Sequence, residues 1–293
     1  MIKLQNDCLS LLVDPFGAQM IELRSQRGTQ YLWGRDKAYW SDCAPVLFPY
    51  IARLTESCYT LNGSCYAMDI HGFAKASMFS IEEQSAAPVT LCLRENAETM
   101  RQYPFRFIFR ARYELRAWSV IVSYVVQNTD GKELFFGIGG HPGFRVPLAA
   151  GTGFEDYELR FSQPCIPDRV GFTEHCFLSG HDSPYALENK RTLRLRHDLF
   201  DQDAIVLKNM ARAVTLCSSK THRAVTVSYP HMPYLGIWQP PHTDAPFVCI
   251  EPWSSLPSRQ NMIEELSCKS DLIRLDSGKA YQNCWAISVT DDV

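Results

Sequence analysis

One carboxylate stands inside an apolar run near the C-terminal end of the chain. Glu251 follows Val248-Cys249-Ile250 and precedes Pro252-Trp253, a composition typical of a buried β-strand. A buried carboxylate loses hydration, which raises its pKa toward the range where a general base works efficiently near neutral pH. Simple alternation along the strand would equally allow Glu251 to face solvent. The sequence therefore predicts either a general base or a surface carboxylate here.

Two histidines stand at glycine-flanked corners. His141 follows Gly137-Ile138-Gly139-Gly140 and precedes Pro142-Gly143-Phe144, and His71 precedes Gly72-Phe73. Glycine allows a positive φ or a close approach of the backbone to a ligand, and Pro142 fixes φ directly after His141. Taken alone, such a histidine is more often a hydrogen-bonded structural residue of a turn. Beside a buried carboxylate, an imidazole can instead complete an acid/base pair.

Arg53 ends an apolar segment, residues 44–52, whose two prolines exclude a helix. We expect this segment to be a loop or a sheet edge. Arg53 is either a solvated surface charge or a partly buried group that pairs with an acid or donates to a polar ligand. With Glu251 and the two histidines it could form an acid/base pocket without metal. Three such groups could equally suggest zinc, but H-x-H and H-E-x-x-H spacings are absent.

The sequence around these residues predicts strands. Short runs rich in β-branched and aromatic residues alternate with turn signals along the chain, and Asn62-Gly63 is typical of a type I′ hairpin. In residues 106–115 the odd positions are apolar and the even ones carry charges, Ile108 excepted, as in a strand with one wet face. Residues 147–190 resemble long loops, and helical periodicity is confined to a short stretch near 262–266. The pattern predicts an all-β fold, a large antiparallel β-sandwich, as one domain over residues 1–293.

Composition excludes several classes of function. The 293 residues carry a net charge of −3 and no Lys/Arg block, so neither nucleic acid nor a membrane surface is expected as a partner. The N-terminus lacks an apolar signal core, and no apolar run is long enough to span a bilayer. The eleven cysteines are scattered without a C-x-x-C pair. We expect them to be reduced thiols of a cytoplasmic protein.

Several short motifs, taken in order along nearly the whole chain, carry a family resemblance. They are Leu47-Phe48-Pro49 with Arg53, His71-Gly72-Phe73-Ala74, Tyr103-Pro104-Phe105, Gly139-Gly140-His141-Pro142 with Phe144, and Cys249-Ile250-Glu251-Pro252-Trp253. Each motif is weak alone, but the ordered set resembles the aldose 1-epimerase (galactose mutarotase-like) family, specifically its LacX-like branch.

The resemblance implies a β-supersandwich with few short helices, an isomerase that interconverts the α and β anomers of a hexose, and no metal or other cofactor. Glu251 would be the general base that takes the proton of the anomeric hydroxyl, and His141 the general acid that protonates the ring oxygen. His71 and Arg53 would hold sugar hydroxyls or polarise the ring oxygen. Asp203 resembles the sugar-binding aspartate of the family, although Asp201 is close by in the sequence.

The chain departs from the family pattern at three places, and these concern the substrate more than the acid/base pair. Ala52 replaces a more usual glycine, Lys75 a frequent arginine, and Ser254-Ser255-Leu256-Pro257-Ser258 lacks an expected glycine. A related enzyme for phosphorylated hexoses would need a cationic site, for which Arg53, Lys75 and Arg145 are scattered candidates. A non-catalytic sugar-binding protein on the same fold is the other alternative. Trp238 and Trp253 would offer stacking faces in either case, or simply belong to the core.

Overall fold

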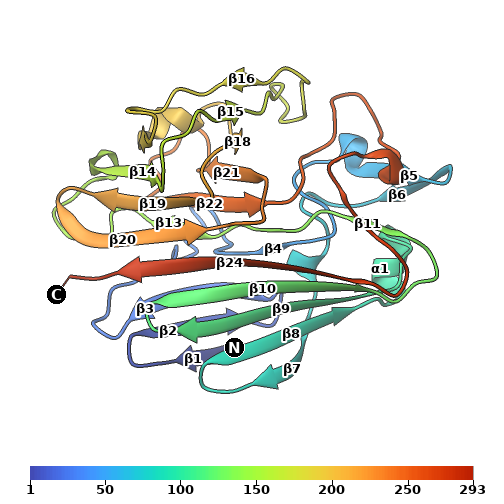
Figure 1. Cartoon of the computed structure of the whole chain (residues 1–293), viewed down its shortest axis with the longest axis horizontal. Coiled ribbons are helices and arrows are strands. Elements are labelled where there is room, and N and C mark those ends of the chain that lie inside the picture. Colours follow the sequence, from blue (N-terminus) through green and yellow to red (C-terminus); the bar gives the residue numbers. More distant parts are fainter. Residues whose placement is uncertain (293) are drawn as a thin grey trace.

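A long antiparallel sheet forms one layer of the protein (Figure 1). The computed structural model describes residues 1–292, and the order of strands across this nine-stranded sheet is β17 (Thr192–Arg194), β14 (Tyr157–Phe161), β19 (Ala213–Ser218), β20 (Thr221–Ser228), β24 (Ala280–Thr290), β10 (Ser119–Asn128), β9 (Phe107–Arg116), β8 (Pro88–Arg94) and β7 (Ser80–Gln84). Side chains of β9 and β10 alternate between buried and partly exposed positions, because successive residues of a strand point to opposite faces. The alternation expected for residues 106–115 is thereby confirmed.

A second antiparallel sheet carries the segments singled out by the sequence. Its strands run in the order β16 (Ser183–Pro184), β15 (Asp168–Arg169), β18 (Ile205–Lys208), β21 (Tyr234–Trp238), β22 (Phe247–Trp253), β12 (Gly139–Gly140) and β4 (Val46–Leu47), and β13 (Gly143–Arg145) also pairs with β22. Every residue of β22 is buried, so this strand is covered on both faces. The segment before Arg53 forms the sheet edge, as its prolines predict.

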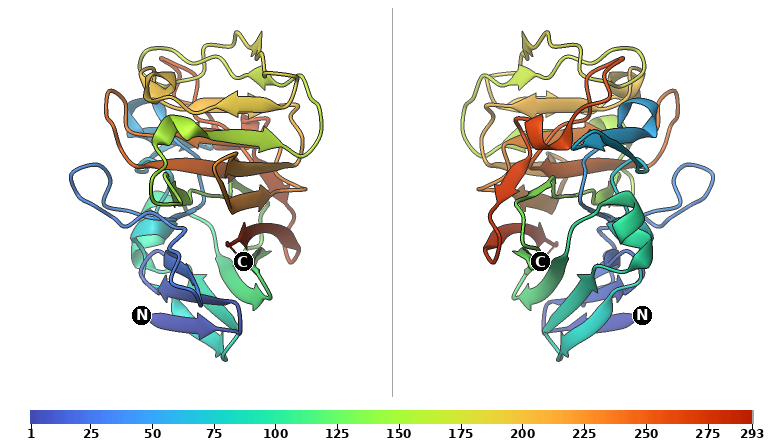
Figure 2. Two further views of the ribbon diagram at one scale, coloured as in Figure 1. Left: turned by 90° about the vertical axis from the view of Figure 1, so that its left-hand side faces the viewer. Right: turned by 90° about the vertical axis from the view of Figure 1, so that its right-hand side faces the viewer.

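Smaller elements complete the sandwich. A third sheet consists of β1 (Ile2–Gln5), β2 (Leu9–Asp14) and β3 (Gln19–Ser25), and it lies at the end of the molecule opposite β15 and β16 (Figures 1 and 2). Two further pairs are β5 (Cys58–Leu61) with β6 (Ser64–Ala67) and β11 (Leu134–Phe136) with β23 (Ile273–Leu275). The helices are α1 (Ala97–Gln102) and short 3-10 turns at Thr55–Ser57, Ala74–Ala76, Phe154–Asp156, His197–Phe200 and Leu266–Cys268.

The core lies between the sheets and is rich in aromatic rings. Phe48 contacts Phe107, Phe109 and Phe136 at ring-centroid distances of 5.2, 4.7 and 5.6 Å. Aromatic side chains bury large apolar areas, and these contacts join the segment before Arg53 to the long sheet. Trp285 of β24 is 1% exposed and packs beneath Gly140. The long sheet therefore supports the strands that carry the histidine corner.

Most of the predicted strands are confirmed, and so is the predicted all-β sandwich. Asn62 and Gly63 have φ values of 51° and 79°, as a type I′ turn requires. The prediction of a helical stretch near residues 262–266 is wrong, since only a 3-10 turn begins at Leu266. The observed helix, α1, was missed in the sequence and is held by a capping box in which Asn96 and Thr99 bond reciprocally. Strand β14 was also missed, inside the predicted loop region.

All eleven cysteines are free in the structure, as expected of reduced thiols. Among residues 1–292, the structure contains no helix with the length and apolar character needed to cross a membrane.

The carboxylate of Asp291 ties the third sheet to the long sheet. Its side chain is 3% exposed, accepts hydrogen bonds from Ser25 and Thr29 of the β3 region, and contacts Arg223 Nε of β20 at 3.0 Å. Burial alone would raise its pKa, but the hydrogen bonds and Arg223 outweigh burial and hold the pKa of Asp291 below its usual value of 3.8. The charged form is thus the one that the folded protein stabilises.

We expect Asp291→Asn to lower the free energy of unfolding at neutral pH by about 1–3 kcal/mol, the range for hydrogen bonds to a charged group. A depressed folded-state pKa contributes stability above the unfolded-state value, and that contribution is lost as pH falls through the folded-state value. The difference between wild type and variant should therefore shrink once pH drops below about 3.8. Urea unfolding between neutral and acidic pH measures this difference.

Asp292→Asn is the matched control, because Asp292 Oδ2 also lies 3.0 Å from Arg223 Nε but its side chain is 45% exposed. We expect this variant to cost less than about 1 kcal/mol, as exposed ion pairs do. Equal losses in both variants, or a loss in Asp291→Asn that does not change with pH, would contradict the assignment.

Candidate active site

The register of β22 with its neighbours places His141 opposite Glu251. Gly139 of β12 pairs with Trp253, and Gly143 of β13 pairs with Cys249. His141 lies midway between the two glycines and Glu251 midway between their partners, so the same antiparallel register brings the two side chains together. On the other edge of β22, Glu251 pairs with Gly236 of β21. Two residues 110 positions apart in the sequence therefore meet through ordinary strand pairing.

His141 and Glu251 form a buried contact. His141 Nε2 lies 3.2 Å from Glu251 Oε2, and the two residues are 8% and 1% exposed. Burial raises the pKa of Glu251, and the nearby Asp203 carboxylate raises it further. Burial lowers the pKa of His141. The solvent-facing alternative for Glu251 is wrong, and the buried interpretation is confirmed.

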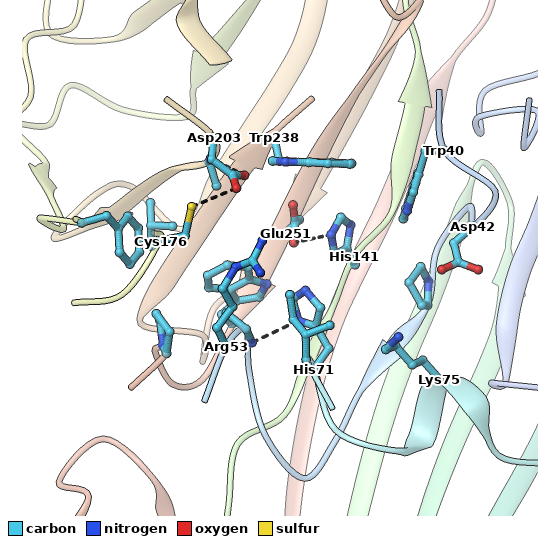
Figure 3. A pocket seen from close by; sticks show the side chains of 18 of the residues that line it. Trp40, Asp42, Arg53, His71, Lys75, His141, Cys176, Asp203, Trp238 and Glu251 are labelled. Carbon is cyan, nitrogen blue, oxygen red and sulfur yellow. Dashed lines mark hydrogen bonds and ion pairs between the residues drawn. The ribbon is translucent and has the colours of Figure 1, made fainter. Parts of the chain in front are cut away.

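Three rings surround the His141 imidazole and fix its orientation. Trp40 lies 4.9 Å from it, tilted by 32°, while Trp238 and His71 approach edge-on at 5.5 and 5.4 Å. His141 Nδ1 is buried and lacks a hydrogen-bond partner within residues 1–292. Because the rings restrict rotation, Nε2 stays directed at Glu251. Figure 3 shows this arrangement from the side of the pocket.

His71, which lies beside His141, is held in one tautomer by the backbone of Ala52. The backbone N–H of Ala52 donates to His71 Nδ1 at 3.1 Å, so the ring proton must be on Nε2 when the imidazole is neutral. Burial lowers the pKa of His71, and the neighbouring His141, Lys75 and Arg53 lower it further. His71 therefore presents a neutral N–H donor at the pocket.

All six residues predicted for the site line a single cavity of about 320 Å³. Besides Glu251, His141 and His71, these are Arg53, Asp203 and Trp238. Arg53 is exposed and forms no ion pair within residues 1–292, so the alternative of a partly buried arginine is wrong and that of a solvated charge is confirmed; its side chain nevertheless lines the cavity. Asp203 belongs to the cavity, whereas Asp201 lies outside it, 3.2 Å from His242.

Sequence reasoning missed several residues of the cavity wall. Trp40, Asp42, Cys176 and Gln202 also line it. Cys176 Sγ donates to Asp203 Oδ2 at 3.0 Å, which fixes one carboxylate oxygen of Asp203. All four residues lie in loops. Loop residues carry no periodic pattern, so nothing in the sequence pointed to them.

The glycines before His141 have a different role from the one expected. None of Gly137, Gly139 and Gly140 has a positive φ, and their close contacts are to the protein and not to the open cavity. A Cβ on Gly140 would lie 2.5 Å from Trp285 Cζ2, and one on Gly139 would lie 2.8 Å from the carbonyl oxygen of Pro252. These glycines allow β12 to pack tightly against β22 and the core.

One group of potential metal ligands is present among residues 1–292. Ligand atoms of His141, Cys249 and Glu251 all lie within 4.8 Å of one another, and all three residues are buried. Cys249 follows the alternation of β22 and points to the same side as Glu251. The sequence-based search for metal spacings did not find this group, because its members meet through strand pairing.

The fold and the cavity define a β-sandwich protein with a buried carboxylate–imidazole pair at the base of a small-molecule pocket. The sequence model of the aldose 1-epimerase family matches residues 1–265. Protein LacX (chromosomal) of Lactococcus lactis subsp. lactis is 32% identical over 291 residues, which cover 95% of this chain and 96% of LacX.

Two solved structures have the same fold. A galactose mutarotase related enzyme from Lactobacillus acidophilus superposes with a TM-score of 0.94 at 29% identity, covering 99% of this chain and 97% of that one. A galactose mutarotase-like protein from Lactobacillus casei superposes with a TM-score of 0.92 at 30% identity, covering 99% and 100% of the two chains. The chain belongs to the aldose 1-epimerase family and has the galactose mutarotase-like β-sandwich. The resemblance to the LacX-like branch is confirmed.

The structure explains why glycine is more usual at the position that Ala52 occupies. Ala52 has a φ of 57°, in the left-handed region that costs an L-residue roughly 1–2 kcal/mol and glycine almost nothing. Glycine loses about 0.5–1 kcal/mol of this advantage through its greater freedom in the unfolded chain. We expect Ala52→Gly to raise the free energy of unfolding by about 0.5–1 kcal/mol, measured by urea unfolding.

Gly72→Ala makes the reverse substitution at another residue with a positive φ, and its effect on stability is compared with that of Ala52→Gly. Gly72 has a φ of 72°, and a Cβ there would lie 2.4 Å from the Phe48 carbonyl oxygen. We expect this variant to be destabilised by roughly 2 kcal/mol or more, since backbone must move. A destabilised Ala52→Gly protein would show that the left-handed backbone at Ala52 is not strained.

Proposed function

We propose that the protein is an aldose 1-epimerase that interconverts the α and β anomers of a hexose. Glu251 removes the proton of the anomeric hydroxyl while His141 protonates the ring oxygen, and the bond between the anomeric carbon and the ring oxygen breaks. The open-chain aldehyde then rotates about its first carbon–carbon bond. Reversal of the two proton transfers closes the ring as the other anomer.

The contact between His141 Nε2 and Glu251 Oε2, at 3.2 Å, is the observation that supports this proposal most strongly. The anomeric hydroxyl and the ring oxygen are bonded to the same carbon, so a base and an acid that serve both must be close neighbours. A shared proton on such a pair also suits a cycle in which acid and base exchange roles on the return step. Positioned acid/base groups typically contribute roughly 10²–10⁴-fold each.

The other cavity residues are assigned to sugar binding. His71 Nε2–H donates to a sugar oxygen, Asp203 accepts from hydroxyl groups, and Arg53 donates from the cavity wall. Trp238 offers an apolar face beside His141, which suits the C–H face of a pyranose. The eleven free thiols favour a reducing, cytoplasmic location.

Polarimetry on freshly dissolved α-D-glucose or α-D-galactose tests the reaction. We expect the wild type to accelerate mutarotation, and Glu251→Gln or His141→Asn to lower the rate by roughly 10²–10⁴-fold, because each removes one of the two proton-transfer groups. Unchanged mutarotation on adding the wild type would favour the non-catalytic sugar-binding alternative.

His222→Asn is the matched control, since His222 is exposed and lies on β20 outside the cavity. We expect it to keep the wild-type rate. The thermal midpoints of all variants should be measured alongside, so that loss of folding is distinguished from loss of chemistry. Wild-type rates in folded Glu251→Gln would remove the catalytic assignment.

A hexose phosphate is the second candidate substrate, because Lys75 and Arg53 both line the cavity. Arg145, the third sequence-based candidate, lies outside it. Two carboxylates, Asp42 and Asp203, line the same cavity and offset its two cations, and the His141–Glu251 pair carries no net charge, so no excess positive charge remains to bind a phosphate dianion. The balance of charge therefore favours an unphosphorylated hexose.

We expect glucose 6-phosphate to show a kcat/KM at least about tenfold below that of free glucose, a difference of about 1.4 kcal/mol, because the cavity offers the phosphate no excess positive charge. Lys75→Gln should leave the rate on free glucose within about threefold. If the phosphate ester is the better substrate and Lys75→Gln abolishes that preference, the substrate is a hexose phosphate.

A further inference from the structure

The buried thiol of Cys249 lies directly behind the proposed acid/base pair and has no role in the proposed reaction. Cys249 and Glu251 are two residues apart on β22, with side chains on the same side of the strand. Their ligand atoms and that of His141 lie within 4.8 Å of one another. Cys249 pairs with Gly143, where a Cβ would lie 3.4 Å from Cys249 Sγ. The absence of a side chain at Gly143 thus leaves room for the Cys249 thiol close to the His141 imidazole.

A polar atom of this group lacks a partner. His141 Nδ1 is buried without a hydrogen bond among residues 1–292, and the one neighbour of the buried Glu251 Oε2 that the site provides is His141 Nε2 at 3.2 Å. Cys249 is 0% exposed. Buried polar atoms without partners are costly and native proteins keep few of them. An imidazole nitrogen, a thiolate and a carboxylate oxygen are, moreover, the three ligand types that zinc uses.

We propose that His141, Cys249 and Glu251 form an inhibitory site for Zn²⁺ or a cation of similar softness. The cation enters through the sugar cavity, which both His141 and Glu251 line. A water molecule from the cavity completes a four-coordinate shell, as in open zinc sites. The thiol proton and the proton held by the His141–Glu251 pair are both released to water as the bonds from the metal to sulfur, nitrogen and oxygen form, and the metal is neither oxidised nor reduced.

The geometry requires only small movements. Bonds of about 2.0–2.3 Å to a tetrahedral zinc ion place ligand atoms roughly 3.5 Å apart, and the three atoms here already lie within 4.8 Å. Side-chain shifts of about an ångström are therefore sufficient. The bound cation occupies both proton-transfer groups, so sugar turnover stops. The proposed reaction itself uses no metal.

Direct metal binding tests the site without reference to catalysis. The full-length protein is titrated with Zn²⁺ against a chromophoric chelator, and with Co²⁺ to detect the thiolate-to-cobalt absorption band. We expect one equivalent to bind, and Cys249→Ser, which nearly preserves side-chain volume, to bind at least about tenfold more weakly and to lack the band.

Cys176→Ala is the matched control, because the Cys176 thiol lines the cavity itself and bonds to Asp203. It should bind the metal as the wild type does. No tight binding by the wild type, wild-type binding by Cys249→Ser, or loss of binding in Cys176→Ala would each overturn the proposal.

The expectation that Zn²⁺ inhibits the enzyme rests on the proposed function. We expect Zn²⁺ to abolish mutarotation by the wild type and a chelator to restore it, while Cys249→Ser keeps the metal-free rate and resists Zn²⁺. If the wild type binds metal through Cys249 but never catalyses mutarotation, the metal site stands and the proposed function fails. If Cys249→Ser is inhibited as strongly as the wild type, the cation acts elsewhere and the proposal is overturned.

Discussion

The site depends on a carboxylate and an imidazole that share a dry environment. Burial raises the pKa of Glu251 and lowers that of His141, so burial alone favours the neutral form of each, while their mutual attraction favours the ion pair. Both arrangements hold one proton and have the same net charge. The pair can therefore occupy the base of an apolar cavity without leaving an uncompensated charge, which would be costly. A proton that moves easily between two partners is also what a reversible ring opening requires.

Close packing around β22 makes the contact between His141 and Glu251 possible. Gly236 pairs with Glu251, and a Cβ there would lie 3.2 Å from Glu251 Cβ and 3.1 Å from Trp253 Cζ2. Gly140 lies on Trp285 of the long sheet. Glycines on the neighbouring strands thus lie beside the Glu251 carboxylate, and large aromatic residues pack beneath them. The same close packing leaves room for the Cys249 thiol beside the pair. A protein interior at this density holds side chains in defined rotamers, which keeps the proton-transfer distance short.

The strands were largely predictable from the sequence, because alternation and turn residues are local signals. The sequence left open whether Glu251 is buried or faces solvent. A strand that is covered on both faces shows no alternation of apolar and polar residues, and the structure shows that β22 is such a strand. Four of the six predicted site residues, Arg53, His71, His141 and Glu251, belong to the sequence motifs, whereas Asp203 and Trp238 were singled out separately. The structure brings all six to one cavity. Trp40, Asp42, Cys176 and Gln202 could not be found, because their place in the cavity depends on how loops cross the sheet. Helix α1 depends on a short capping box and not on periodicity, which is why it was missed.

The backbone at three residues that line the cavity carries strain that the fold holds in place. Ala52, His71 and Asp203 have φ values of 57°, 67° and 68°, and none of them is glycine. Such conformations cost of order 1–3 kcal/mol each and persist only where the surroundings fix them. Here the Ala52 N–H holds His71 Nδ1, and the Cys176 thiol holds one Asp203 oxygen. Two side chains that face the acid/base pair are therefore oriented before any ligand arrives. Orientation of this kind reduces the entropy lost when a small polar ligand binds, and it gives the strained backbone at this cavity a role in binding.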